Sequence, residues 1–241
     1  MNLYIELLYR PLLNILFFLY GLLPFHDIGL AIILLTLLVR LLLLGPTVKT
    51  IRHQKRLSAL QPKVDALKQQ HGKDKERLAK ELMELYKQEK VNPLSSCLPL
   101  LIQLPLLIAL YRVFQVGLSV PPDGLLYSFV QRPMSISPLF LGAMDLAKPN
   151  IILVLITAVV QYLQMRMLPA TAALSPSTTP ESERQSKLMN TQMQLLGPIL
   201  TLVIGLRLPS ALILYWLVST LFQLGTQWYG LRPTRHLTPD T

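Results

Sequence analysis

The sequence predicts an all-α membrane protein with five transmembrane helices, an N-terminal interfacial helix and a cytosolic antiparallel helical hairpin. Hydrophobic residues make up 51% of the 241 residues and the mean hydropathy is +0.43, which is too apolar for an ordinary soluble domain. Several apolar runs approach the roughly 20 residues that cross a hydrocarbon core as a helix. Twelve of the 23 Lys and Arg residues lie between Lys49 and Lys90, directly after the first strong run, as in a cytosolic loop.

The segment 1–25 is hydrophobic but carries Glu6, Arg10 and Asn14 at every fourth position, which draws one polar stripe along a helix. A helix of this kind lies in the membrane interface. A cleaved signal peptide and a spanning helix are the alternatives. A signal peptide opens with positive charge, whereas here Glu6 precedes the first basic residue. We therefore expect an interfacial helix.

The first span is predicted at 26–46 and contains Arg40 within an aliphatic run. A charge there costs about 2.5–3.5 kcal/mol on insertion scales, so it usually faces a partner or a wet cavity. Thr36 lies one turn earlier on the same face, which suggests an inward polar stripe. Gly45-Pro46 follows closely, so the Arg40 side chain can also snorkel to the headgroups. Position alone leaves both interpretations open.

The charged segment 47–92 is predicted to form the cytosolic hairpin. Apolar residues recur at spacings of three and four on both sides of a turn at 71–74, which predicts two amphipathic helices with a kink near Pro62. The charged surface is either a solvated face that sets topology or a docking surface for anionic lipid, ribosomal RNA or a nascent chain. The apolar residues of the two stripes are Leu57, Leu60, Val64 and Leu67, then Leu78, Leu82 and Leu85.

The second half of the chain supplies the other four spans. The second span contains Gln103 between two prolines, which free backbone carbonyls and need neighbouring helices to satisfy them. The third contains Gln161 and Gln164 one turn apart on one face. The predicted segments are a span at 93–116, an external loop at 117–149, a span at 150–168, a cytosolic linker at 169–188, spans at 189–207 and 210–230, and a cytosolic tail at 231–241.

The distribution of positive charge predicts the topology. With the hairpin inside, the inner segments hold seventeen Lys and Arg residues and the outer segments four. This asymmetry places the N-terminus outside and the C-terminus in the cytosol.

The chain offers no pattern for covalent chemistry. It has no GxSxG, HExxH, P-loop or GxGxxG sequence, a single cysteine, four scattered histidines and no acidic residue within the aliphatic run 28–44 or the four later predicted spans. We therefore expect no enzyme activity, no metal and no cofactor. The spans instead offer hydrogen-bonding groups and one cation, which suit water and acidic polypeptide: Arg40, Thr36, Gln103, Gln161, Gln164, Trp216, Gln223 and Gln227.

Four stretches resemble the YidC/Oxa/Alb family of membrane protein insertases, and most closely its five-span bacterial form. They are GLAIILLTLLVRLLLLGP (29–46), LQPKVDALKQQHGKDKERLAKELMELYKQ (60–88), NPLSSCLPLLIQLPLLIALY (92–111) and LILYWLVSTLFQ (212–223). Thr220 stands where the family pattern leads us to expect asparagine, and Ser96 where we expect glycine.

The resemblance implies a water-filled groove that is open to cytosol and lipid and closed toward the outside. Arg40 matches the groove arginine that attracts the hydrophilic segment of an incoming protein, and Gln164 and Trp216 line the groove, with Gln161 as a neighbour. The candidate groove residues are Arg40, Thr36, Gln103, Gln161, Gln164 and Trp216.

The resemblance also implies the cellular setting. Nascent membrane proteins are the substrates, the ribosome and the Sec translocon are candidate partners, and the protein acts as a monomer in the bacterial cytoplasmic (inner) membrane. No nucleotide is consumed and no small molecule is the substrate.

A small channel or anion transporter that uses Arg40 as its selectivity charge is the competing hypothesis. It predicts a continuous pore and usually an internal repeat. The sequence shows no repeat, and the charged hairpin has no role in such a protein.

Overall fold

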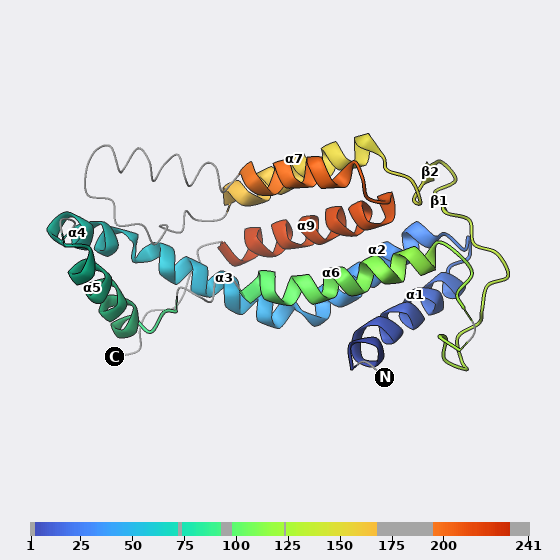
Figure 1. Ribbon diagram of the computed structural model, residues 1–241, viewed down its shortest axis with the longest axis horizontal. Coiled ribbons are helices and arrows are strands. Elements are labelled where there is room, and N and C mark those ends of the chain that lie inside the picture. Colours follow the sequence, from blue (N-terminus) through green and yellow to red (C-terminus); the bar gives the residue numbers. More distant parts are fainter. Residues whose placement is uncertain (1–2, 72–73, 93–97, 123, 168–194, 232–241) are drawn as a thin grey trace.

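The computed structural model describes residues 3–71, 74–92, 98–122, 124–167 and 195–231, and most of these are helical. Long helices lie side by side along the long axis of an elongated bundle (Figure 1). Two short helices, α4 and α5, project at one end, which we call the hairpin end. The connection between α6 and α7 lies at the other end, which we call the loop end.

The chain begins with a short π-helix, η1 (Ile5–Tyr9), that continues into α1 (Arg10–Leu22). The α1 helix packs against α2 and α6 and buries its apolar face in the core. Together Ile5–Leu22 form a helix that is long and apolar enough to cross a membrane, and a third of it is buried. Length and hydropathy do not set the orientation of a helix, so the interfacial placement of 1–25 stays a prediction.

The first predicted span corresponds to α2 (Ile28–Leu42), which ends at Leu42 and not at 46. The axis turns by 61° and continues as α3 (Leu44–Ala59). Pro46 explains the position of the bend, because it has no N–H to donate to the Leu42 carbonyl and its ring would clash with that carbonyl in a continuous helix. At the other end of α2, the Asp27 side chain accepts a hydrogen bond from Leu30 N at 3.0 Å and caps the helix.

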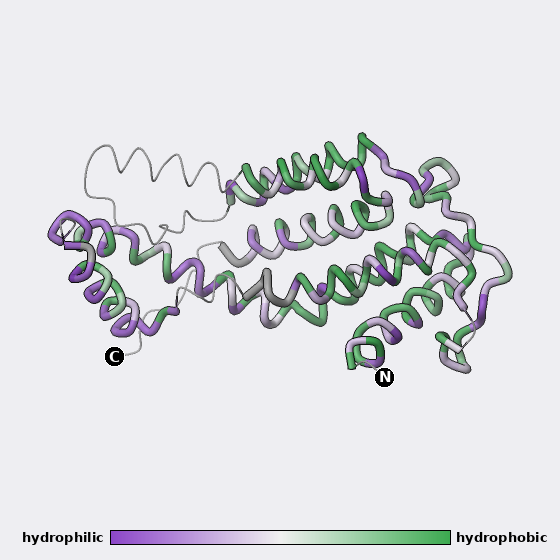
Figure 2. The backbone as a smooth tube through the Cα atoms, viewed as in Figure 1, coloured by the Kyte–Doolittle hydropathy of each residue, from purple (hydrophilic) through white to green (hydrophobic). Residues whose placement is uncertain are grey.

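The charged segment forms α4 (Gln61–His71) and α5 (Lys75–Gln88), which pack together over a small apolar cluster. The interruption lies at Leu60, and Pro62 occupies the first turn of α4, where its missing N–H costs nothing. His71 Nε2 lies 3.1 Å from Glu81 Oε2 across the pair. The buried cluster contains four residues of the predicted stripes, with two others: Leu60, Val64, Leu78, Leu82, Tyr86 and Val91. This part of the chain is the most hydrophilic (Figure 2).

The next helix is α6 (Leu98–Gly117), which continues through Pro105. The connection that follows contains a two-stranded antiparallel sheet, β1 (Leu139–Phe140) and β2 (Met144–Asp145), which lies near the start of α2 (Figure 1).

The last three described helices are α7 (Ile151–Met167), a helix at Leu195–Gly205 and α9 (Ser210–Leu231). Extensive contacts join α9 to both α7 and α2. The outward faces of α7 and the helix at Leu195–Gly205 carry exposed apolar side chains, as suits contact with lipid: Ile151, Ile152, Leu155, Ile156, Val159, Leu163, Leu196, Ile199, Leu200 and Val203.

The number of spans stays a prediction. Within the described ranges, one helix satisfies the length and hydropathy of a span, or two if α2 and α3 count as one bent span, while α7 and the helix at Leu195–Gly205 are apolar but shorter. The predicted linker at 169–188, the start of the span at 189–207 and nearly all of the tail at 231–241 lie outside the described residues.

The hydrophobic core gathers where α1, α2, α6 and α9 meet toward the loop end. Its largest fully buried side chains come from all four helices and from the connection before α7, so the loop is part of the packed core: Leu13, Leu16, Phe17, Ile28, Ile32, Leu35, Leu110, Val113, Leu146, Ile213 and Tyr215. Val154 of α7 is buried in the same core, which holds these helices in fixed relation to one another.

Candidate functional site

Arg40 lies near the end of α2 and is only 7% exposed. Its Nη2 donates a hydrogen bond to Gln103 Oε1 on α6 at 2.9 Å. No carboxylate pairs with Arg40 among the described residues, and its Nε has no hydrogen-bond partner there. The guanidinium contacts neutral oxygens, and a buried charge without a counter-ion is unfavourable. The site is therefore prepared to receive a negative group.

Gln223 on α9 is the second partner of Arg40. Its amide can be turned two ways: in one, the oxygen accepts from Gln164 Nε2 at 2.7 Å and the NH₂ group faces the guanidinium. In the other, the oxygen accepts from Arg40 Nη1 at 2.9 Å and Nη2 at 3.1 Å, and the nitrogen faces Gln164. We assign the second, with the Gln164 amide turned to match, because a guanidinium has only donors and repels an NH₂ group. The arrangement joins α2, α7 and α9.

Gln103 links Arg40 to a third helix. Its Nε2 donates a hydrogen bond to the hydroxyl of Tyr215 on α9 at 2.6 Å, while its Oε1 accepts from Arg40. Both ends of the Gln103 amide are therefore satisfied. Tyr215 is 1% exposed, and its ring packs against Phe114 with centroids 6.1 Å apart. We call these five residues the Arg40 network: Arg40, Gln103, Gln164, Tyr215 and Gln223.

Four members of the network lie toward the same end of the bundle. Arg40, Gln164 and Gln223 are late in α2, α7 and α9, and Gln103 is early in α6, which runs in the opposite direction. This is the end from which α3 leads to α4 and α5 (Figure 1). These four polar side chains therefore lie toward the hairpin end, away from the apolar core.

The other predicted groove residues do not join the network. Thr36 is buried on the same side of α2, but its hydroxyl donates to the Ile32 carbonyl of its own helix at 2.6 Å. Gln161 accepts from the Thr201 hydroxyl at 2.5 Å and joins α7 to the helix at Leu195–Gly205. Trp216 is partly buried against the apolar core. The structure thus brings Arg40, Gln103 and Gln164 together and leaves the other three apart.

Two members were not among the predicted groove residues. Gln223 belongs to the polar groups noted within the spans, but nothing in the sequence aligns it with Arg40. Tyr215 precedes Trp216 in an apolar stretch and looks like an ordinary core residue. The eight-residue spacing between Tyr215 and Gln223 places both on one face of α9, and this spacing is the signal that identifies them together.

The loop end is closed by hydrogen bonds between the connection and the helix starts. Asp27 accepts from Leu141 N at 2.6 Å in addition to capping α2. Ser210 N and its hydroxyl both donate to the Lys148 carbonyl, and Ala211 N donates to the carbonyl of Leu146. The connection is thereby tied to the first residues of both α2 and α9.

The α1 helix holds an earlier part of the connection. Asn14, which is buried, accepts from Tyr127 N at 2.5 Å and donates to the carbonyl of Leu125 at 3.1 Å. Arg10 donates to the carbonyls of Leu125 and Gly124 and lies over the Tyr127 ring at 5.1 Å. Two residues of the polar stripe predicted for 1–25 thus bind the connecting loop.

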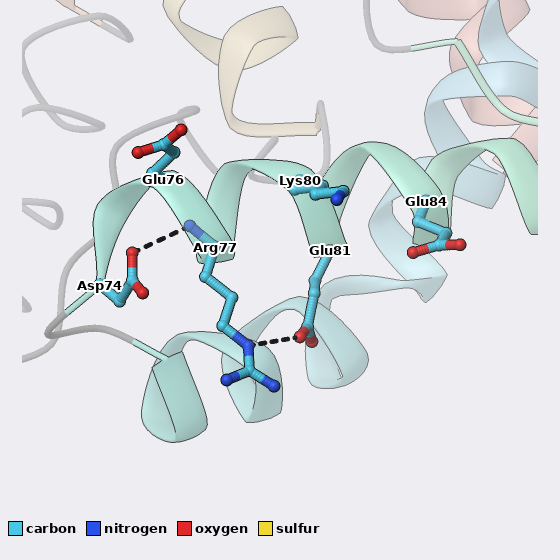
Figure 3. Close-up of a pocket in the computed structure, with 6 residues that line it drawn as sticks. All are labelled: Asp74, Glu76, Arg77, Lys80, Glu81 and Glu84. Carbon is cyan, nitrogen blue, oxygen red and sulfur yellow. Dashed lines mark hydrogen bonds and ion pairs between the residues drawn. The ribbon is translucent and has the colours of Figure 1, made fainter.

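A charged depression lies on α5 (Figure 3), far from the Arg40 network. Two hydrogen bonds lie within it: Asp74 accepts from Arg77 N at 3.0 Å and caps α5, and Arg77 Nε donates to Glu81 at 3.3 Å. Such exposed pairs contribute little energy and are typical of a solvated helix face. We place no site there.

The Arg40 network contains one cation, three amides and a phenol, and no grouping of His, Cys, Asp and Glu in the described part of the chain could hold a metal ion. Its groups can bind water and polar or acidic polypeptide.

Comparison with known proteins gives the family. Residues 18–236 match the model of the 60Kd inner membrane protein family. A protein of Clostridium tetani named membrane protein insertase YidC is 33% identical over 202 residues, which cover 84% of this chain and 80% of the relative. A Fusobacterium nucleatum protein of the same name is 33% identical over 208 residues, covering 86% and 87%.

Longer relatives match as well. A Magnetococcus marinus protein, again named membrane protein insertase YidC, is 33% identical over 213 residues, which cover 88% of this chain and 33% of the relative. The chain thus spans about a third of the length of that protein. The similarity extends over the helices that carry the Arg40 network, so this chain belongs to the 60Kd inner membrane protein family, which groups it with the YidC membrane protein insertases.

Proposed function

We propose that this protein is a membrane protein insertase. It receives a nascent membrane protein in a hydrophilic groove around Arg40 and moves the hydrophilic segment of that protein across the inner membrane. The observation that carries the proposal is the burial of Arg40 among neutral amide oxygens, with no carboxylate partner in the described ranges. An acidic segment supplies the missing counter-ion, so its attraction to the site is electrostatic.

The direction of movement follows from the two ends of the bundle. The hairpin end faces the cytosol, in agreement with the charge asymmetry of the sequence, and the loop end faces outward. A hydrophilic segment reaches Arg40 from the cytosolic side, while the apolar helix that follows it leaves sideways into lipid. Partitioning of that helix into the bilayer drives the step, so the protein itself consumes no nucleotide.

The charged surface of α4 and α5 supplies the cytosolic contact with the ribosome, the incoming chain and the Sec translocon. One copy of the chain suffices, because the Arg40 network is formed within a single bundle. The Arg40 network, Thr36, Gln161 and Trp216 line the path of the substrate.

The test is insertion of a single-span protein with an acidic tail into liposomes that contain the purified chain, scored by protease protection. Arg40→Lys keeps the charge and retains most of the activity, whereas Arg40→Ala loses at least tenfold, a change that corresponds to about 1.4 kcal/mol. Equal insertion by Arg40→Ala and wild type would contradict the role of Arg40. Steady, selective ion conductance by the same vesicles would instead support a channel.

A further inference from the structure

Tyr215 is linked to Arg40 through Gln103, and its hydroxyl also interacts with the guanidinium. Its hydroxyl accepts from Gln103 Nε2 at 2.6 Å, and Gln103 Oε1 accepts from Arg40 Nη2 at 2.9 Å. The three side chains come from α9, α6 and α2, so this short chain of hydrogen bonds joins three helices. Tyr215 is among the most deeply buried side chains of the protein.

The amide of Gln103 needs this anchor because a glutamine side chain is long and its terminal torsion is soft. Arg40 makes use of only one end of the amide, the oxygen. With Tyr215 bound to the nitrogen, the oxygen is directed toward Arg40. Without the hydroxyl, the amide loses one of its two attachments and the guanidinium loses a fixed acceptor.

The α9 helix therefore holds the guanidinium in two ways. Gln223 contacts Arg40 directly, with its oxygen 2.9 Å from Nη1 and 3.1 Å from Nη2. Tyr215, two turns earlier on the same face, acts through Gln103. Acceptors that approach from α6 and α9 restrict the position of the guanidinium within the groove.

We propose that Tyr215 is a positioning residue that, through Gln103, holds the Arg40 guanidinium in place and thereby sets the preference of the groove for acidic over uncharged hydrophilic segments. This inference rests on the proposed insertase function. Placement matters for a charged segment because a carboxylate binds a guanidinium through directed hydrogen bonds. An uncharged polar segment gains much less from a fixed guanidinium.

The experiment compares two tails on the same single-span substrate: one with two aspartates, and one with asparagines in their place. Tyr215→Phe removes only the hydroxyl and keeps the ring that packs on Phe114. Loss of a hydrogen bond of this kind corresponds to roughly a threefold to tenfold decrease in insertion of the acidic tail. Insertion of the asparagine tail changes less than twofold. Tyr162→Phe, on the outward side of α7, is the matched control and leaves both rates unchanged.

A double-mutant cycle separates positioning from a general structural effect. If Tyr215 acts mainly through Gln103, Tyr215→Phe causes a clearly smaller loss in a Gln103→Leu background than in wild type. Additive losses, or equal losses for both tails, would overturn the proposal. If Tyr215→Phe cannot be purified folded, Gln103→Leu alone must abolish the preference for the acidic tail, and its retention would overturn the proposal equally.

The result also distinguishes a failure of the proposed insertase function from a failure of the proposed role of Tyr215. Failure of wild type to insert either tail counts against the insertase function. Wild-type insertion with an acidic preference that Tyr215→Phe leaves intact counts only against the role of Tyr215.

Discussion

The loop end and the hairpin end of the bundle use buried polar groups in opposite ways. At the loop end, Asp27 and Asn14 each satisfy backbone groups of the connecting loop, so donors and acceptors are paired within the protein. At the hairpin end, Arg40 keeps an unpaired Nε and no carboxylate partner in the described part of the chain. Paired groups stabilise a closed structure, whereas an uncompensated charge remains available for a ligand.

This difference predicts two classes of variants. Changes at the loop end lower stability and leave the discrimination between acidic and uncharged tails intact. Changes at the hairpin end alter that discrimination with little effect on stability. The variants below test the contrast, beginning with the largest expected effect on stability.

Asp27→Ala removes the cap of α2 and leaves Leu141 N without its acceptor. The expected loss is about 2–4 kcal/mol, from a lost cap and an unsatisfied buried donor. The midpoint of thermal unfolding in detergent measures it. Asp74→Ala is the matched control, because Asp74 caps the exposed α5 but binds no distant loop. A similar decrease for both variants would show that the contact with the loop contributes nothing.

Gly29→Ala introduces a Cβ atom that would overlap the Phe140 ring of β1. Overpacking of this kind costs about 1–3 kcal/mol. Gly21→Ala in α1 is the control, since its Cβ meets open space. Shortening the opposing residue in Gly29→Ala/Phe140→Leu recovers part of the loss. A stable Gly29→Ala variant would mean that β1 does not pack tightly on α2.

Gln164→Leu is a change at the hairpin end. It removes the amide that supports Gln223 but leaves the contact of Gln223 with Arg40. Stability changes by less than about 1 kcal/mol, the usual value of one hydrogen bond. Insertion of the acidic tail falls about twofold to threefold, consistent with a loss of that size. A large decrease in thermal stability with unchanged tail preference would contradict the contrast between the ends.

The sequence predicted the polar residues of the site better than their partners. A charge within an aliphatic run identifies Arg40 from local chemistry alone. Gln103 and Gln164 are polar residues in apolar helices and are found in the same way. The Thr36 hydroxyl donates to a backbone carbonyl of its own helix, as threonine often does in helices. The spacing of polar residues in the sequence does not reveal this bond.

A single sequence does not show which distant residues form hydrogen bonds with one another. The contact of Asp27 with Leu141 joins residues 114 positions apart, and that of Gln103 with Tyr215 joins residues 112 apart. The bend at Leu43 is different, because Pro46 predicts it locally, yet the apolar run continues to 44 and hides the end of the helix. The family resemblance predicted a groove, which stays a prediction, and the hydrogen-bond partners could be identified only from the packed helices.

The α2 helix runs from the loop end to Arg40, so its length fixes the distance between the loop end and the buried charge. Asp27 and Arg40 are thirteen residues apart along α2, which is about 20 Å at the rise of an α-helix. A polypeptide whose carboxylate is bound at Arg40 needs about six extended residues to cover that distance. In the proposed insertase, with the loop end facing outward, a hydrophilic tail with at least this many residues beyond its acidic position would reach the outer surface while still bound at Arg40, and a shorter tail would have to leave Arg40 first. The length of α2 would then distinguish long tails from short ones.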